Sequence, residues 1–164
     1  MIIFRSACLT LTALMIMSLA APLRAEGQMV KRFETRYTEI FYDSDEEIKS
    51  FFWRIGGKEI DIYAYPGFAK SRVDRIIEKV QSLLDMYPDG FKVAIYLRRE
   101  YESGHIAFYR QEDRSITVYA DRVTENVLAH EISHAVIHAY FGVSPPQKAQ
   151  EILSQYVDKH LWSD

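Results

Sequence analysis

The sequence predicts an α+β domain in which a small mixed or antiparallel sheet packs on helices. Short runs of alternating polar and apolar residues, typical of strands, fill much of the chain before residue 121. The clearest helical stripe lies within residues 66–84, and a second helical region spans residues 127–156. Strands and helices do not alternate strictly as they do in βαβ folds, and no repeat or flexible linker divides the chain. These observations indicate one α+β domain.

Residues 1–25 have the pattern of a secretory signal peptide. Arg5 gives a basic start, residues 7–19 are almost wholly apolar, and cleavage is expected after Ala25, with Ala20 as a second candidate position. The apolar run is shorter than the roughly 20 residues that a membrane-spanning helix needs. We therefore expect an exported bacterial protein, periplasmic or secreted. Its mature domain would be residues 26–164, with no membrane span after signal cleavage.

The mature chain would be acidic and free of cysteine. Cys8 is the only cysteine and lies within the predicted signal peptide, which excludes disulfides, thiol catalysis and cysteine zinc ligands from the mature domain. The net charge is −3, and loss of Arg5 and Arg24 would leave −5. Because the basic residues are scattered rather than gathered in a stripe, we expect no nucleic-acid partner.

The first part of the predicted domain consists of two strands and the helix between them. Residues 32–42 alternate polar and apolar side chains and predict one strand. Residues 44–47, Ser-Asp-Glu-Glu, form a capping box that begins a helix, and the glycine pair at 56–57 ends it. Residues 58–65 alternate again and predict a second strand.

The middle of the domain is predicted to hold a long helix, a central strand and a β-hairpin. The helix follows Pro66, and an apolar stripe between residues 73 and 84 would face the core. Residues 91–97 read as a central strand after a turn. Residues 105–120 read as a hairpin with its turn at residues 111–114.

The chemistry is concentrated in an HExxH motif formed by His130, Glu131 and His134. On a helix, residues four apart lie on one face, so both histidines can hold a single ion. Glu131 would lie beside the open coordination position, where a carboxylate can deprotonate a water. Zinc assists this step because its bound water has a pKa of about 7.

Helix geometry predicts the third ligand. The HExxH helix is expected to end near residues 140–141, with Gly142 as its stop, and residues 144–147 read as a new capping box with proline at the first helical position. So short a connection favours an antiparallel helical hairpin. His134 and Glu151 would then both lie about 9–10 Å from the bend, which makes Glu151 the third ligand.

The same register gives a partner for the first histidine. Gln155, one turn beyond Glu151, would lie level with His130, one turn before His134. Its amide oxygen is predicted to accept the second ring N–H of His130 and so fix the tautomer of that ligand.

These residues resemble the gluzincin branch of zinc metallopeptidases, which combine HExxH with a downstream glutamate. Residues 150–156 resemble the glutamate helix of that family, with Ile152 where glycine is common and Ser154 where alanine is common. The resemblance implies a zincin-like fold and one Zn²⁺ as cofactor. It assigns His130, His134 and Glu151 as metal ligands and Glu131 as general base.

The resemblance also bears on substrate binding. In gluzincins a strand just before the HExxH helix forms the rim of the cleft, so one arm of the 105–120 hairpin would offer its edge to an extended peptide. The alternative is that both arms pair inside the sheet. A tyrosine or histidine often stabilises the oxyanion in this chemistry, and the candidate is Tyr156, with Tyr119 and Tyr140 as alternatives.

The remaining histidines are weaker metal candidates. His138 lies about 12 Å along the helix axis from His130, too far for one tetrahedral ion, so it is expected behind the ligands or in a cleft wall. The metzincin pattern is excluded because Ile137 and Tyr140 stand where it needs glycine and histidine. His160 would lie on the face opposite Glu151 and is expected at the surface or in packing.

The sequence therefore predicts an exported zinc-dependent peptidase in which a zinc-bound water, activated by Glu131, hydrolyses a peptide or protein substrate. A protein partner that completes the cleft is compatible with the small size of the domain. The alternative is a non-catalytic, zinc-stabilised binding or adaptor module, and a further alternative is that HEISH is a core helix without metal. Glu131 favours the enzyme, because a structural site has no use for a general base.

Overall fold

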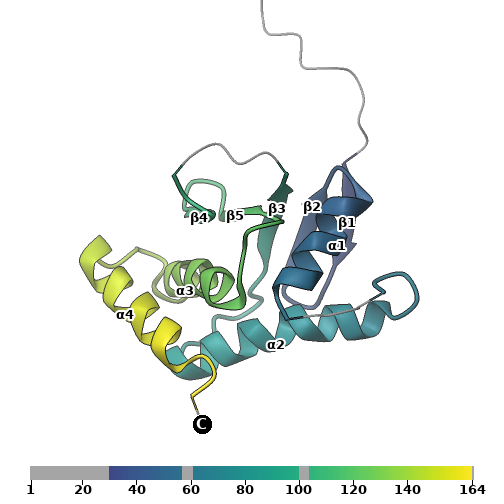
Figure 1. Ribbon diagram of the computed structural model, residues 1–164. Helices are drawn as coiled ribbons and strands as arrows, with labels where there is room; N and C mark the ends of the chain where they lie inside the picture. Colours follow the sequence, from purple (N-terminus) through teal and green to yellow (C-terminus); the bar gives the residue numbers. More distant parts are fainter. Residues whose placement is uncertain (1–29, 57–60, 100–103, 164) are drawn as a thin grey trace, which may run out of the picture.

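The computed structural model describes residues 30–56, 61–99 and 104–163. It contains a five-stranded mixed sheet and four helices (Figure 1), which confirms the predicted α+β class with a mixed sheet. The strands are β1 (Lys31–Glu34), β2 (Thr38–Tyr42), β3 (Val93–Arg98), β4 (Ala107–Arg110) and β5 (Ser115–Tyr119). The helices are α1 (Asp45–Arg54), α2 (Pro66–Leu84), α3 (Glu125–Phe141) and α4 (Gln147–His160).

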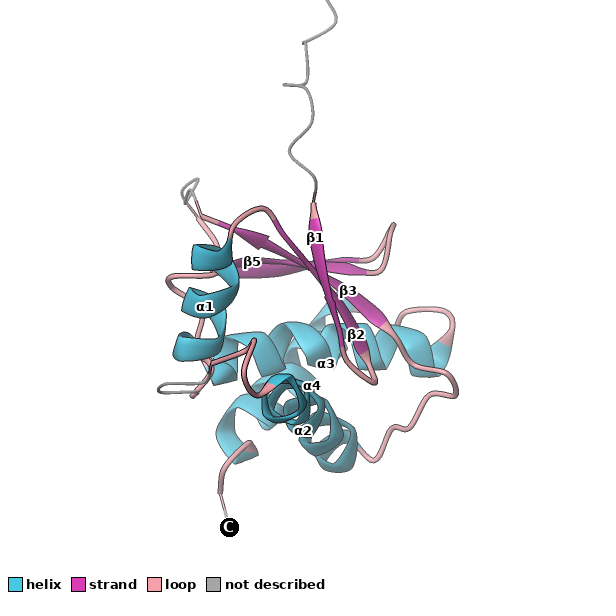
Figure 2. Ribbon diagram, turned by 90° about the vertical axis from the view of Figure 1, so that its right-hand side faces the viewer, coloured by secondary structure: helices cyan, strands magenta, loops and turns pink. Residues whose placement is uncertain are grey.

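The sheet has the order β1-β2-β3-β5-β4, with the long helices α2 and α3 on one side of it (Figures 1 and 2). β3 is central and pairs in parallel with β2 and β5, whereas β1 and β4 are antiparallel to their neighbours. Ile40, Ile95 and Ile116 lie side by side in the register and are fully buried. Burial of such aliphatic side chains, worth ~1.5–3 kcal/mol each, fixes the face on which the helices pack.

Both N-terminal helices form as predicted. Ser44 and Glu47 make the reciprocal contacts of a capping box at the start of α1. Gly56 follows that helix with a φ of +89°, a backbone conformation that favours glycine. The apolar stripe of α2, represented by Val73, Ile76 and Val80, is fully buried.

Two predicted strands differ from the structure. Residues 32–42 form the hairpin β1–β2 rather than one strand, because the Thr35 hydroxyl accepts the Tyr37 and Thr38 N–H groups and turns the chain. Of residues 58–65, 58–60 lie outside the described residues and 62–64 form a turn. There the Asp61 carboxylate accepts two backbone N–H groups, a local contact that prevails over the alternating pattern.

The predicted central strand and the 105–120 hairpin are confirmed as β3 and β4–β5. β4 ends the sheet order, so one of its edges is left without a strand partner within the described part of the chain. Residues 1–25, the predicted signal peptide, lie outside the described residues. None of the described helices is long and apolar enough to cross a membrane.

The connection between the last two helices is partly as predicted. α3 ends at Phe141, and Gly142 has a φ of +68°. The second capping box is wrong: α4 begins at Gln147 with Pro146 as its N-cap and no side-chain cap. A residue before proline is driven to extended backbone, so Ser144 and Pro145 cannot start the helix and Ser144 lies too far from its first turn.

Candidate metal centre

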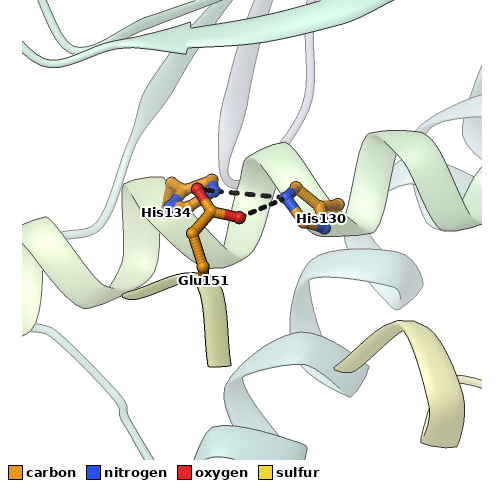
Figure 3. A group of neighbouring side chains, drawn as sticks. All are labelled: His130, His134 and Glu151. Carbon is orange, nitrogen blue, oxygen red and sulfur yellow. Dashed lines mark hydrogen bonds and ion pairs between the residues drawn. The ribbon is translucent and has the colours of Figure 1, made fainter. Parts of the chain in front are cut away.

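The predicted ligands His130, His134 and Glu151 come together between α3 and α4 (Figure 3). The two Nε2 atoms lie 3.3 Å apart. The Glu151 carboxylate reaches from α4 to a point between the histidines, with Oε2 3.6 Å from Nε2 of His130 and Oε1 3.6 Å from Nε2 of His134. The side chains are 23%, 12% and 40% exposed, so solvent reaches the group from the α4 side.

The three side chains are close enough together to hold one metal ion. Ligand atoms about 2.0–2.2 Å from a tetrahedral zinc ion lie about 3.3–3.5 Å from one another. The two Nε2 atoms lie 3.3 Å apart, each lies 3.6 Å from a different oxygen of Glu151, and one ligand atom from each residue falls within 4.8 Å of the others. Two imidazoles and a carboxylate are also a donor set that catalytic zinc sites use, with a fourth position left for water or substrate.

The tautomer of His130 is set by Asp158, not by Gln155. Nδ1 of His130 lies 2.9 Å from Oδ2 of Asp158, seven residues beyond Glu151 and hence on the same face of α4. A carboxylate accepts a hydrogen bond from the protonated Nδ1, which leaves the lone pair of Nε2 free to bind a metal ion. The prediction for Gln155 is wrong, since that side chain is exposed.

A buried hydroxyl pair joins the helices just beneath the ligands. Oγ of Ser133 lies 2.5 Å from Oγ of Ser154, and both side chains are fully buried. Ser133 also donates to the carbonyl oxygen of His130 at 2.6 Å. Ser154 takes the place of the alanine common in the gluzincin pattern, and its small side chain permits the close approach of α4 to α3 that brings in Glu151.

Glu131, next to His130 on α3, points toward a different neighbour of this helix, the edge strand β4. Its Oε2 accepts the backbone N–H of Tyr109 at 2.7 Å. Burial raises the pKa of the Glu131 carboxyl above its usual range, while the Tyr109 hydrogen bond and the nearby His130 and His134 act in the opposite direction. Such an environment suits a group that must both accept and release a proton.

The other predicted candidates lie outside the ligand group. Tyr156 is 46% exposed and its ring packs on that of His160, with centroids 4.3 Å apart, so its role as oxyanion donor stays a prediction. His160, expected at the surface or in packing, is partly exposed and packs against this ring. Tyr140 is half exposed and Tyr119 is buried on β5. His138 is not with the ligands: it lines a pocket beside Tyr109, and its Nδ1 is 2.8 Å from the Tyr109 hydroxyl.

Sequence reasoning missed two residues, Asp158 and Tyr109. Asp158 could have been found from the sequence, because it lies seven residues after Glu151 and residues seven apart on a helix share a face. Tyr109 could not, because its contact with Glu131 is made by a backbone N–H, which any residue except proline carries.

No family model, curated protein or solved structure matches this chain. The resemblance to gluzincins therefore rests on the residues of α3 and α4 alone.

Proposed function

We propose that this protein is an exported zinc-dependent peptidase with a zincin-like fold, related in its chemistry to gluzincins. The observation that carries the proposal is the convergence of His130, His134 and Glu151 at distances that suit one zinc ion, with Glu131 on the same helix. A purely structural zinc site is normally closed by a fourth protein ligand and does not need an adjacent carboxylate.

Each residue of the site has a separate proposed role. His130, His134 and Glu151 would hold the ion, which supplies Lewis acidity for peptide-bond hydrolysis. The Glu131 carboxylate would accept a proton from the attacking water and pass it to the leaving amine nitrogen. Asp158 would keep His130 in the tautomer whose Nε2 is free to bind.

The sheet edge supports an extended peptide as the substrate. β4 has one edge without a strand partner within the described residues. On that edge the N–H of Tyr109 already donates to Glu131, so an added peptide would pair with the other outward backbone groups of β4. A peptide added as a strand along this edge would pass over α3 next to Glu131. This arm of the hairpin is therefore the proposed rim of the substrate site.

The test is the substitution Glu131→Gln in the purified protein. We expect zinc content to be unchanged and hydrolysis of a labelled, denatured protein to fall by about 10²–10⁴-fold, the range lost with a general base. Glu46→Gln, at an exposed position of α1, is the matched control and should retain full activity. Undiminished hydrolysis by Glu131→Gln would contradict the mechanism.

A chelator distinguishes the enzyme from a zinc-stabilised binding module. The buried core includes apolar residues of α3 and α4 but none of the three ligands, so we expect chelation to abolish hydrolysis with the protein still folded. Cooperative unfolding on chelation would favour the module instead.

For export, we expect the mature chain purified from its bacterial source to begin at Glu26, and a retained residue 1 would contradict cleavage.

A further inference from the structure

Tyr109 on β4 contacts α3 at two points. Its backbone N–H donates to Oε2 of Glu131 at 2.7 Å, and its phenol oxygen lies 2.8 Å from Nδ1 of His138. Glu131 and His138 are seven residues apart, so they lie on the same side of α3, about 10 Å from each other along its axis. Tyr109 therefore contacts two positions of α3 that lie about two helical turns apart, Glu131 through its backbone N–H and His138 through its hydroxyl.

The backbone contact is available because of the place of Tyr109 in the sheet. It pairs with Ile116 of β5, but its N–H goes to Glu131 and is not used between the strands. The distance of this N–H from the carboxylate depends on how firmly β4 is held against α3. β4 pairs with one strand only in the described part of the chain, so a second attachment has a large effect on its position.

The phenol provides that second attachment. The Tyr109 hydroxyl and Nδ1 of His138 lie 2.8 Å apart and share a hydrogen bond whose direction depends on the His138 tautomer, and burial raises the pKa of the phenol to about 12. His138 is only 9% exposed, and the two rings meet edge to face with centroids 6.2 Å apart. A hydrogen bond in such surroundings is directional and holds its partners in one arrangement.

We propose that Tyr109 and His138 are positioning residues for Glu131. The Tyr109–His138 contact fixes β4 against α3, and the Tyr109 N–H then holds Oε2 of Glu131, which leaves Oε1 to take the proton. The catalytic part of this inference rests on the proposed role of Glu131 as general base. The structural part, that the phenol controls the N–H···carboxylate contact, does not.

The structural part is tested by amide hydrogen exchange measured by NMR in the purified protein. We expect Tyr109→Phe to speed exchange at the amide of residue 109 by about three- to tenfold, with Ile95 in the central strand as an unaffected reference. His138→Leu should have the same effect. His138→Asn, which keeps a polar group near the position of Nδ1, should restore much of the protection. Unchanged exchange at residue 109 in both Tyr109→Phe and His138→Leu would overturn the proposal.

The catalytic part is tested with the same variants on a labelled, denatured protein. We expect kcat to fall about tenfold in Tyr109→Phe with zinc affinity unchanged, because the metal-binding side chains lose no group, whereas KM rises only as far as β4, the proposed rim of the substrate site, shifts. Tyr96→Phe, the same change on β3, is the control. A fall in zinc affinity, or an unchanged kcat with faster exchange, would contradict the positioning role. Absence of turnover in the parent protein would refute the peptidase while leaving the exchange result decisive for the contact itself.

Discussion

The two sides of α3 make different contacts, although the HExxH motif belongs to both. On one side His130 and His134 face α4, which contributes Glu151 and Asp158. On the other side Glu131 faces β4, which contributes the N–H of Tyr109. On the α4 side, the Nε2 atoms of the two histidines and the carboxylate of Glu151 converge. On the β4 side, the carboxylate of Glu131 accepts a backbone N–H. The proposed metal binding and the proposed proton transfer therefore depend on different neighbours and should be separable by substitution.

The largest expected effect on the α4 side is the loss of a ligand. Glu151→Ala removes one of three donors, and zinc affinity should fall by more than about 100-fold, beyond the loss usual for a residue behind the ligands. The fold should persist, because the Glu151 side chain is 40% exposed. Competition with a chromogenic zinc chelator measures the affinity. Zinc bound as tightly as in the parent would remove Glu151 from the site.

A smaller effect is expected from the residue behind His130. Asp158→Ala should lower zinc affinity about 10–100-fold, since His130 then loses the acceptor that fixes its tautomer. Asp158→Asn should lose less, because an amide oxygen can still accept the Nδ1 proton without the charge. Both variants are measured by the same competition. An affinity equal to that of the parent in Asp158→Ala would show that the contact does not tune the ligand.

The ligands could be predicted from the sequence because both signals are local. The i, i+4 spacing of the histidines and the stop at Gly142 fix one helix, and the short connection places Glu151 opposite His134. The residues beyond the ligands depend on how the helices cross, which spacing along each helix does not determine. The carboxylate of Glu151 lies between the two histidines rather than level with His134 alone, so the partner of His130 is Asp158 instead of Gln155.

The errors in the fold have a related cause. Residues 32–42 and 58–65 alternate as strands do, but Thr35 and Asp61 bond to backbone N–H groups close by and turn the chain. Side-chain bonds to nearby backbone compete directly with strand pairing. Where no such residue interrupts the pattern, as in α2 and β3, the prediction is confirmed.

The smallest expected effect is at Gln155. This side chain is exposed on α4, one turn from Glu151, and Gln155→Ala should leave zinc affinity within about twofold of the parent. It therefore serves as the matched control for Asp158→Ala, because both remove a polar side chain from the same helix. If Gln155→Ala lowered zinc affinity as much as Asp158→Ala, the loss in both variants would come from destabilisation of α4 and not from the contact between Asp158 and His130.

The most direct test of the separation between the two sides of α3 is the zinc content of the parent protein and of Glu131→Gln, measured side by side after supply of zinc and removal of excess. The contacts on the α4 side predict one equivalent in both, because Glu131 belongs to the β4 side and contributes no ligand. A folded parent protein that binds no zinc would contradict the metal centre. Zinc bound by the parent but lost in Glu131→Gln would contradict the separation of metal binding from proton transfer.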